Sequence, residues 1–397
     1  MKRLSPLRDF LRTEAAGGAL LVAGTIVALA WANSPWSGSY ESFWTSELHL
    51  RVAGQALELD LRHWLNDGLM TIFFFVVGLE IKRELVDGHL STRRTASLPI
   101  ACALGGMVVP ALLYLAIAGR SAADGWAVPV ATDIALAVGI VTVVGARVSA
   151  PNRTFLLGLA VVDDIGAIVV IAIFYASDLS VGWLLVAIAG VVATVVARRV
   201  GVRMTWPYIV IGVAMWLGLH EGGIHATLAG VAMGLLTPAT PSVDERSESI
   251  VERLERLLHP WTGYLIVPVF AVANAGIEVS TDGLCHAVRS PITWGIVVGL
   301  VVGKPIGIDI ARRLATRAGL AATVPGTTAR VDVGLGAAAG IGFTVALFIA
   351  ELAFDDATHQ RDAKLGILVA SVIAAGLSLL VLRGAPVTER TADLSSA

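Results

Sequence analysis

The sequence predicts an all-α polytopic membrane protein that crosses the bilayer about twelve times, and three observations support this class. The hydrophobic residue types make up 56% of the 397 residues, with 41 glycines in addition. Charged residues make up 15% of the chain, against about 25% in soluble domains. A soluble chain of this composition would lack the polar side chains that cover a water-exposed surface. The apolar residues also fall into runs of about 20, the length of a membrane-spanning helix.

The charge balance and the cysteines exclude other classes. A net charge of −2 gives no basic balance that would suggest a nucleic-acid partner. The two cysteines, Cys102 and Cys285, lie far apart and have neither metal-ligand spacing nor the pattern of a disulfide framework. We therefore expect membrane lipids to surround the chain, with no nucleic acid among its partners.

The N-terminus allows two interpretations. A basic segment precedes the apolar run from Ala15 to Ala30, which ends in small residues. This pattern is shared by a cleaved signal peptide and by a retained first membrane helix. Because further apolar segments follow, a retained helix accounts for the pattern equally well. On that interpretation, residues 1–14 form a cytoplasmic segment.

The apolar runs define the order of the spans. They lie near 15–33, 64–81, 96–118, 124–145, 153–175, 181–197, 205–219, 222–238, 261–279, 291–311, 331–353 and 364–382. The seventh and eighth are short, and the residues from His220 to Gly223 leave only a tight turn between them. A transmembrane domain is thus predicted at residues 15–383, followed by a polar cytoplasmic tail at 384–397.

The distribution of positive charge supports this count. With a cytoplasmic N-terminus, the inner segments contain most of the 29 Lys and Arg residues. The outer loops contain Arg51, Arg62, Arg120, Arg289, Arg361 and Lys364. Such an asymmetry is what the positive-inside rule expects. An error of one span would reverse the later loops, so an even number is favoured.

One extramembrane segment has a strand pattern. Apolar and polar side chains alternate in residues 48–52 and again in 57–61, on either side of a short Ala-Gly-Gln connection. This alternation predicts a β-hairpin at residues 46–62. Because an isolated hairpin is only marginally stable in water, we expect it to pair or pack with another element.

Two predicted spans are interrupted. The fourth contains Pro129 to Asp133 at its centre, and the eleventh contains the glycines of 334–336 and 340–342. Either alone could be a helix-packing contact, because glycine and proline are common in membrane helices. However, the third to fifth spans and the tenth to twelfth could be two matching halves, with the interrupted helix as the middle member of each. A pair of interrupted segments at corresponding positions points to a transporter site.

Two adjacent aspartates lie in the fifth span. Asp163 and Asp164 lie near its centre, in Val161-Val162-Asp163-Asp164-Ile165. Neighbouring helical residues point about 100° apart, so at least one must face a protein interior or water. Two structural carboxylates hydrogen-bonded to other helices are the alternative. Because an ionisable group within a span is costly, a functional role is the default hypothesis.

Such a pair suits cation exchange. Burial and a like-charged neighbour both favour the protonated carboxyl, and the two protons then leave as a coupled pair. Sodium, as a hard cation, favours oxygen ligands by the same logic as magnesium and calcium. Cation and protons would therefore compete for the same oxygens.

Two further charges lie inside spans. Asp133 follows Thr132 at the interruption of the fourth span, where it can balance exposed helix N-termini. Lys304, in the tenth span, can balance helix C-termini or pair with a carboxylate. The alternative for Lys304 is a lysine that extends its ammonium to the membrane surface.

Other titratable residues have weaker signals. Glu80 and Glu84 are four residues apart on one helix face, where an ordinary charged membrane rim is equally compatible. His225 could titrate near neutral pH, although a packing or capping histidine fits the pattern as well.

Motifs along the chain resemble the NhaA-type sodium/proton antiporters from about residue 8 to 383. They are Trp64-Leu65-Asn66-Asp67-Gly68 through Glu80, Ala131-Thr132-Asp133, Asp163-Asp164-Ile165-Gly166-Ala167, Ala273-Asn274-Ala275-Gly276, Val302-Gly303-Lys304-Pro305 and Gly342-Phe343-Thr344. They occur in the family's order. This family is itself a standard example of inverted repeats with broken helices at the midplane.

The resemblance implies a fold and a site. It implies twelve spans with inverted repeats, in which the fourth and eleventh are broken and cross. The matching carboxylates, Asp163 and Asp164, bind the cation and carry protons, and Thr132 is their neighbour. Asp133 and Lys304 compensate the crossed helix ends, and Lys304 also pairs with Asp163.

The resemblance also implies an activity. It is an electrogenic exchange of internal sodium or lithium for external protons in the bacterial inner membrane, activated at alkaline pH and serving sodium and pH homeostasis. The protein is then a secondary transporter, not an enzyme. It has no cofactor, and the ions that it binds are the transported ones. Residues matching the family's pH response are Glu80, Arg83, Glu84, Glu255 and His259. Asp67 matches an acid near the funnel, and the 46–62 hairpin matches the element that forms the homodimer.

One position departs from the family pattern. Residue 256 is arginine where a relative has histidine, and arginine does not titrate near neutrality. This affects the expected midpoint and steepness of the pH response, but not the expected exchange.

Two other function classes remain to be weighed. An intramembrane aspartyl protease needs two aspartates facing each other, normally from different helices, whereas Asp163 and Asp164 are adjacent on one. A sodium-coupled symporter or a channel is compatible with related folds. A symporter would need a pocket for an organic substrate, which the sequence does not identify.

Overall fold

A computed structural model describes residues 5–52, 55–88, 90–202, 204–239 and 249–386. The first residues of the predicted N-terminal segment, the hairpin turn at 53–54 and most of the predicted tail at 384–397 lie outside these ranges. The described chain is almost entirely helical, and its strands form a single two-stranded sheet.

Seven helical segments in the described ranges are long and apolar enough to cross a membrane. Five of them lie in single helices: Ala15–Ala32 within α1 (Ser5–Ala32), α5 (Arg93–Ala118), α7 (Ala150–Phe174), α8 (Val181–Val200) and α18 (Ala357–Arg383). The segment Ile250–Asn274 consists of α11 (Ile250–Trp261), η4 (Thr262–Ile266) and α12 (Val267–Asn274). The segment Pro291–Arg317 consists of α14 (Pro291–Val298), η5 (Gly299–Gly303) and α15 (Lys304–Arg317). Counting each bent helix pair as one span raises the number to nine. The prediction of a helical, multi-span membrane protein is therefore confirmed.

The two bent pairs occur where the sequence has its interruptions. The first consists of η2 (Arg120–Val130) followed by α6 (Ile134–Val144) and η3 (Gly145–Arg147), with a bend of 49°. The second consists of α16 (Ala329–Ala339) and α17 (Phe343–Ala353), with a bend of 43°. In the first break the backbone of Ala131 is extended, with φ −74° and ψ 150°, so the helical hydrogen-bond pattern stops there.

Shorter helices complete the described chain: α2 (Ser37–Trp44), α3 (Leu61–Trp64), η1 (Leu65–Leu69), α4 (Met70–Val86), α9 (Thr205–His220), α10 (Leu228–Leu236) and α13 (Thr281–Arg289). Helix α10 covers only part of the span predicted near 222–238. The preceding residues form turns, in which Gly223 has a φ of +77°. A Cβ on Gly223 would lie 1.9 Å from the Ser177 carbonyl oxygen, so only glycine fits this turn.

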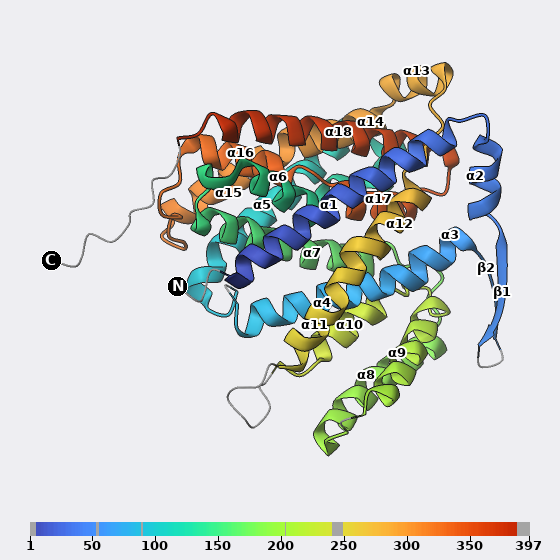
Figure 1. The fold of residues 1–397 in the computed structure, drawn as a ribbon. Helices are drawn as coiled ribbons and strands as arrows, with labels where there is room; N and C mark the ends of the chain where they lie inside the picture. The colour runs from blue at the N-terminus through green and yellow to red at the C-terminus, as the bar shows by residue number, and fades with distance from the viewer. Residues whose placement is uncertain (1–4, 53–54, 89, 203, 240–248, 387–397) are drawn as a thin grey trace.

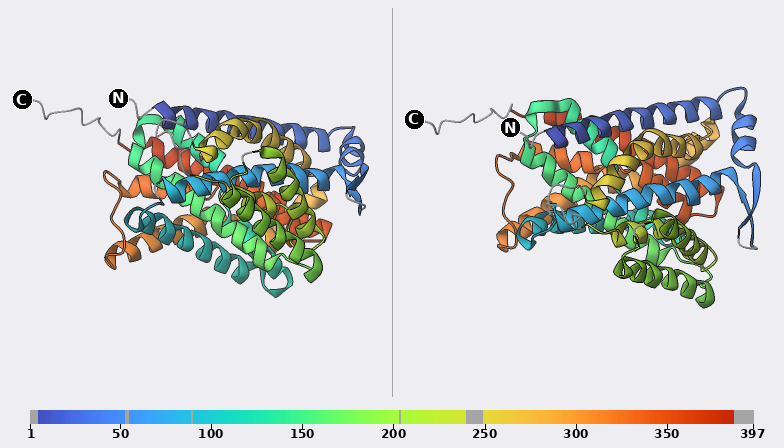
Figure 2. Two further views of the ribbon diagram at one scale, coloured as in Figure 1. Left: turned by 90° about the horizontal axis from the view of Figure 1, so that it is seen from below. Right: turned by 60° about the horizontal axis from the view of Figure 1, so that its bottom comes forward.

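The helices pack into one body with a projecting pair (Figure 1). Helix α5 packs against α7, α14 and α15, while α4 packs against α10 and α11, and α1 against α6 and α12. Helices α8 and α9 pack on each other and extend away from the body in Figure 1 and in the right-hand view of Figure 2. Where α5 meets α15, a Cβ on Gly105 would lie 2.3 Å from the Gly307 carbonyl oxygen. Glycine thus permits this close helix contact.

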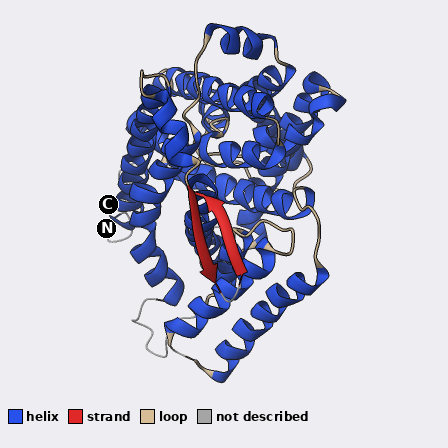
Figure 3. Ribbon diagram, turned by 90° about the vertical axis from the view of Figure 1, so that its right-hand side faces the viewer, coloured by secondary structure: helices blue, strands red, loops and turns tan. Residues whose placement is uncertain are grey.

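The predicted hairpin is confirmed by two antiparallel strands, β1 (Glu47–Val52) and β2 (Gln55–Asp60). Glu47 pairs with Asp60, and Asp60 then caps α3 by accepting a hydrogen bond from the His63 N–H at 2.7 Å. Figure 3 shows the strands side by side in front of the helices. The hairpin lies at one end of the body, and the start of α1 and the end of α18 lie at the other (Figure 1). We call these the hairpin end and the terminal end.

Helix α2 is anchored at the hairpin end by Tyr40. The Tyr40 hydroxyl lies within hydrogen-bond distance of the carbonyl oxygens of Val272 (2.9 Å) and Ala273 (2.8 Å) in α12. Burial raises the pKa of Tyr40 to about 12. The phenol therefore remains a neutral donor at moderately alkaline pH, and the contact between α2 and α12 does not depend on pH there.

Candidate functional site

The two helix breaks contact each other directly through their backbones. The N–H of Asp133, in the first break, donates to the carbonyl oxygen of Ile341, in the second, at 2.6 Å. The Thr132 hydroxyl lies 2.8 Å from the carbonyl oxygen of Ala339, the last residue of α16. Because carbonyls at a helix C-terminus lack intrahelical partners, the first break supplies a donor that the second one needs.

Asp133 places one carboxylate at two helix N-termini. Its Oδ1 accepts from the Leu136 N–H of α6 at 3.0 Å. Its Oδ2 accepts from the Thr344 N–H at 3.1 Å and from the Thr344 hydroxyl at 2.6 Å, in the first turn of α17. The side chain is buried. A negative charge here is stabilised by the unpaired N–H groups and dipoles of both helices.

Lys304 provides the corresponding positive charge. Its ammonium donates to the carbonyl oxygen of Val130, the last residue of η2. The same nitrogen lies 2.8 Å from Oδ2 of Asp163. Both partner types that the sequence left as alternatives thus contact Lys304. Its side chain is completely buried, which excludes an ammonium extended to the membrane surface.

The adjacent aspartates of α7 face two different surroundings. Asp163 is fully buried, and its Oδ2 contacts Lys304 and lies 2.7 Å from the Thr132 hydroxyl. That hydroxyl has one proton, so it can donate to Asp163 or to Ala339 but not to both at once. Asp164 is buried from bulk solvent but lines a cavity. The 100° between successive helical residues accounts for this division.

Each aspartate retains an oxygen without a partner. Among the described residues, no hydrogen-bond donor reaches Oδ1 of Asp163 or Oδ1 of Asp164. Leaving buried polar atoms unpaired is costly unless a ligand, ion or proton satisfies them. The arrangement is therefore suited to binding a small cation or protons.

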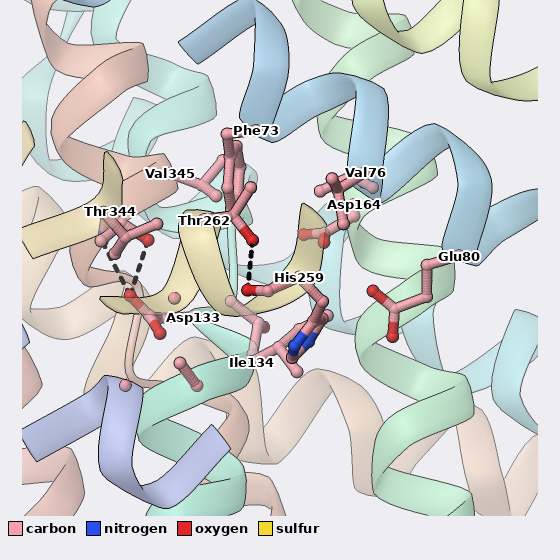
Figure 4. A pocket seen from close by; sticks show the side chains of 16 residues that line it. Phe73, Val76, Glu80, Asp133, Ile134, Asp164, His259, Thr262, Thr344 and Val345 are labelled. Atoms are coloured by element: carbon pink, nitrogen blue, oxygen red, sulfur yellow. Dashed lines mark hydrogen bonds between the residues drawn. The ribbon is translucent and has the colours of Figure 1, made fainter. Parts of the chain in front are cut away.

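A cavity of about 70 Å³ is lined by Asp164 but not by Asp163. Its polar lining residues are Glu80, Thr132, Asp133, Asp164, His259, Thr262 and Thr344. Figure 4 shows Asp133 held by Thr344 on one side of the cavity and Asp164 with Glu80 on the other. Glu80 lies in the half of α4 that is farther from the hairpin. His259 lies in α11, from which the chain continues through α12 toward the hairpin end. The cavity is therefore lined from the terminal end.

The predicted pH-response residues gather near this cavity but do not form one cluster. Glu80 and His259 line it. Arg83 of α4 forms an ion pair with the buried carboxylate of Glu255 in α11, which joins two helices beside the cavity. Glu84 lies one turn beyond Glu80 on α4.

Two other sequence candidates lie apart from the cavity. Asp67 is in η1, nearer the hairpin, where Oδ2 is 3.4 Å from Nδ1 of His220. His225 packs edge-on against Phe348, with ring centroids 5.8 Å apart, which fits the packing alternative. Arg256, at the departure from the family pattern, has an exposed side chain.

Sequence reasoning missed two contributors to the site. Thr344 stood in a quoted motif, but its double contact with Asp133 was not foreseen. Ile341 contributes only a backbone carbonyl, for which the side chain carries no signal. A hydroxyl residue two positions after the last glycine of the break was the available indication for Thr344, because such residues commonly occur at helix starts.

Comparisons with known proteins agree with the resemblance in the motifs. The family model described as Na+/H+ antiporter 1 matches residues 8–382. Over 421 residues the chain is 44% identical to Na(+)/H(+) antiporter NhaA 2 of Sorangium cellulosum, covering 95% of this chain and 89% of that protein. Over 385 residues it is 44% identical to Na(+)/H(+) antiporter NhaA of Shigella dysenteriae serotype 1, covering 95% and 97%. For Na(+)/H(+) antiporter NhaA of Oleidesulfovibrio alaskensis, the identity is 41% over 425 residues, covering 96% and 94%.

Proposed function

Since this chain belongs to the Na+/H+ antiporter 1 family, we propose that it exchanges sodium ions for protons across a membrane at Asp163 and Asp164. The observation that carries the proposal is a pair of buried carboxylates, each with an unpartnered oxygen, beside two crossing helix breaks. Cation and protons compete there for the same oxygens, so occupation by one displaces the other. No separate coupling device is required.

The exchange starts from the cavity at the terminal end. Sodium reaches Asp164 first, because this carboxylate lines the cavity whereas Asp163 lies behind it. As the cation binds, protons leave the two carboxyl groups toward the same side. Thr132 and the carbonyls freed by the breaks supply further oxygens close to the site. After the protein opens to the other side, sodium leaves and protons reload the carboxylates.

Charge compensation keeps the empty site stable during this cycle. Asp133 and Lys304 stay buried and remain with the helix ends that they balance. Lys304 also pairs with the ionised Asp163 carboxylate after sodium has left and before a proton reloads it. Two carboxylates can carry two protons against one monovalent cation, so each cycle moves net positive charge inward and the exchange is electrogenic. Lithium is also a hard cation and uses the same oxygens.

The helices and the charge pattern support a proposed topology. We assign about twelve spans: α1, α3 to α4, α5, η2 with α6, α7, α8, α9, α10, α11 to α12, α14 to α15, α16 with α17, and α18. The group from α5 to α7 and the group from α14 to α18 form inverted repeats. The transmembrane domain covers residues 15–383. By the positive-inside rule both termini are cytoplasmic and the hairpin end is external, in a bacterial inner membrane.

The remaining family properties are part of the same proposal. The hairpin at 46–62 forms a homodimer contact, and the surrounding partners are lipids. Residues beside the inner cavity, among them Glu80, Glu255 and His259, adjust exchange to pH and raise it under alkaline conditions. The protein transports ions without chemical catalysis or a cofactor, and it serves sodium and pH homeostasis.

One assay separates this proposal from the symporter and channel alternatives. In everted membrane vesicles that maintain a proton gradient, sodium is added without any organic solute and a pH-sensitive dye is followed. Antiport predicts immediate dequenching, because sodium drives proton movement. A symporter would need its organic solute, and a sodium channel would not move protons. Absence of dequenching with wild-type protein in the membrane would contradict the proposal.

A further inference from the structure

A second charged pair lies at the hairpin end, apart from the proposed exchange site. Nδ1 of His220, the last residue of α9, is 3.4 Å from Oδ2 of Asp67 in η1. The two side chains are only 24% and 16% exposed. The exchange mechanism described above leaves His220 without a role.

Aromatic side chains hold this imidazole in place. The His220 ring is stacked on Trp216, with centroids 5.3 Å apart and planes within 3°. Trp216 is stacked in turn on Trp64, at 6.2 Å. The Trp216 indole N–H also donates to the Asp67 carbonyl oxygen at 2.9 Å. One indole thus positions both members of the pair, and their contact is a built feature of the fold.

Other charged groups surround the pair less closely. Glu221 follows His220 in the chain, and His225 is near enough for an electrostatic interaction with it. Asp178, in the loop before α8, approaches Gly223 through its backbone. Among the described residues, the acid that hydrogen-bonds the His220 ring is Asp67.

The charge of the pair depends on external pH. A histidine changes charge between about pH 5 and 8. When His220 is protonated, its positive charge offsets the Asp67 carboxylate. When His220 is neutral, Asp67 presents an uncompensated negative charge. A charge that is partly shielded from solvent changes the local concentration of counter-ions, so this pair attracts cations more strongly at alkaline pH.

We propose that His220 controls the attraction of external sodium to the Asp67 carboxylate at the hairpin end and weakens it when the outside is acidic. This inference rests on the proposed exchange function and on an external hairpin end. During exchange, external sodium competes with the protons that must reload the carboxylates. An imidazolium beside Asp67 reduces that competition when protons are abundant, which favours the release of sodium already extruded.

The test measures external sodium affinity in right-side-out membrane vesicles. External sodium drives protons out in the reverse direction, and an internal pH dye reports the initial rate of this efflux from the same starting internal pH in every sample. The apparent KM for external sodium is measured at external pH of about 6 and about 8.5, on either side of the histidine range. Wild type is compared with H220Q, which is always neutral, and with H220R, which is always charged.

The ratio of the wild-type KM to the H220Q KM isolates the effect of the charge on His220. Proton competition at Asp163 and Asp164 changes with pH in every variant, so it cancels in the ratio. At about pH 6, wild type should have a KM about threefold to fivefold above that of H220Q, in the range of a partly exposed ion pair, and at about pH 8.5 the two should agree. H220R should match wild type at the lower pH and exceed it at the higher one.

A matched control is available at the same end. His63 contacts Asp60 at 2.7 Å but is 65% exposed, so H63Q should leave the KM unchanged at both pH values. A wild-type to H220Q ratio that is constant with pH would overturn the inference while leaving exchange intact. Absence of sodium-driven proton movement in wild type would instead overturn the proposed function and, with it, this inference. If H220Q does not accumulate, equal KM values for H220R and wild type at about pH 8.5 would be equally decisive against the proposal.

Discussion

The Asp163 carboxylate and the Lys304 ammonium lie 2.8 Å apart, and both side chains are completely buried. A sodium ion that binds Asp163 therefore competes with protons and also with a cation that belongs to the protein. Removal of one member of such a pair leaves an uncompensated buried charge. The pair is thus the most sensitive point at which to test shared binding of cation and protons.

Replacing Lys304 by alanine should move exchange toward higher pH. Without the ammonium, burial and the neighbouring carboxylate hold protons on the pair more firmly. The apparent KM for sodium should fall as pH rises in both proteins, with the fall displaced to higher pH in K304A. The measurement is KM against pH in proteoliposomes with a clamped gradient.

The control for Lys304 is another lysine with a mostly buried side chain. Lys364 forms an ion pair with Glu351 between α17 and α18, away from the cavity-lining residues, so K364A should keep the wild-type pH dependence. A wild-type KM that is constant between about pH 6 and 9 would contradict competition at a shared site and would indicate separate cation and proton sites.

Replacing Asp164 by asparagine should abolish transport while the protein remains inserted. Asparagine has nearly the same shape but cannot release a proton at physiological pH. Sodium-dependent dequenching in everted vesicles should disappear, at membrane protein levels equal to wild type in a quantitative blot. Normal sodium-driven proton movement in D164N would show that this carboxylate is not part of the exchange site.

Replacing Thr132 by alanine should weaken sodium binding more than replacing it by serine. The threonine hydroxyl lies within hydrogen-bond distance of Asp163 and Ala339, and a hydrogen bond to a charged group contributes about 1.5–3 kcal/mol. We expect the KM of T132A to rise about tenfold, while T132S, which keeps the hydroxyl, stays near wild type. Equal effects of both substitutions would indicate that the methyl group, not the hydroxyl, is required.

Deleting the hairpin, from about Leu48 to Leu61, should yield monomers that still transport. The strands pair with each other and lie at one end of the body, away from the residues of the exchange site. Native gels and cross-linking report the oligomeric state, and the dye assay reports transport. If the deletion variant forms dimers as stable as those of wild type, the main dimer contact lies elsewhere on the protein.

Replacing Gly230 by alanine should destabilise the protein. A Cβ there would lie 2.1 Å from the Thr71 carbonyl oxygen and 2.9 Å from the Phe75 nitrogen, where α10 meets α4. Overpacking of this kind costs about 1–3 kcal/mol, so the thermal transition of the detergent-solubilised protein should fall. Gly376 in α18 has no such neighbour within 4 Å. G376A should therefore leave the transition unchanged or raise it.

The charged site residues could be predicted from the sequence because an ionisable side chain inside an apolar membrane segment is energetically unfavourable. Asp163, Asp164 and Lys304 are ionisable groups within apolar runs, and such groups require a compensating role. Asp133 was detectable because it coincides with a proline-containing interruption. The apolar pattern alone could not say which aspartate meets Lys304, since adjacent helical positions differ only in direction; the pairing with Asp163 was expected from the family resemblance.

Contacts between distant segments were beyond the sequence pattern. Asp133 and Thr344 are separated by 211 positions, and the pair of His220 with Asp67 depends on how α9 packs beside η1. The predicted hairpin was recoverable because alternation is a local signal. The start of the eighth span was misplaced because apolar residues between the glycines of a turn look like the beginning of a helix.

The backbone hydrogen bond from Asp133 to Ile341 also determines which sequence changes the two breaks can tolerate. No side-chain substitution at either position removes it, apart from a proline at 133, which would lack the N–H. A residue inserted or deleted in either break would shift the donor away from the acceptor and displace Thr132 and Thr344 with it. The two breaks should therefore tolerate substitutions better than insertions or deletions. The hydrogen bond itself places no demand on the side chain at 341, where a buried apolar residue satisfies the core packing, but it depends on the number of residues in each break. Single-codon insertions should therefore be far more damaging here than apolar substitutions at 341.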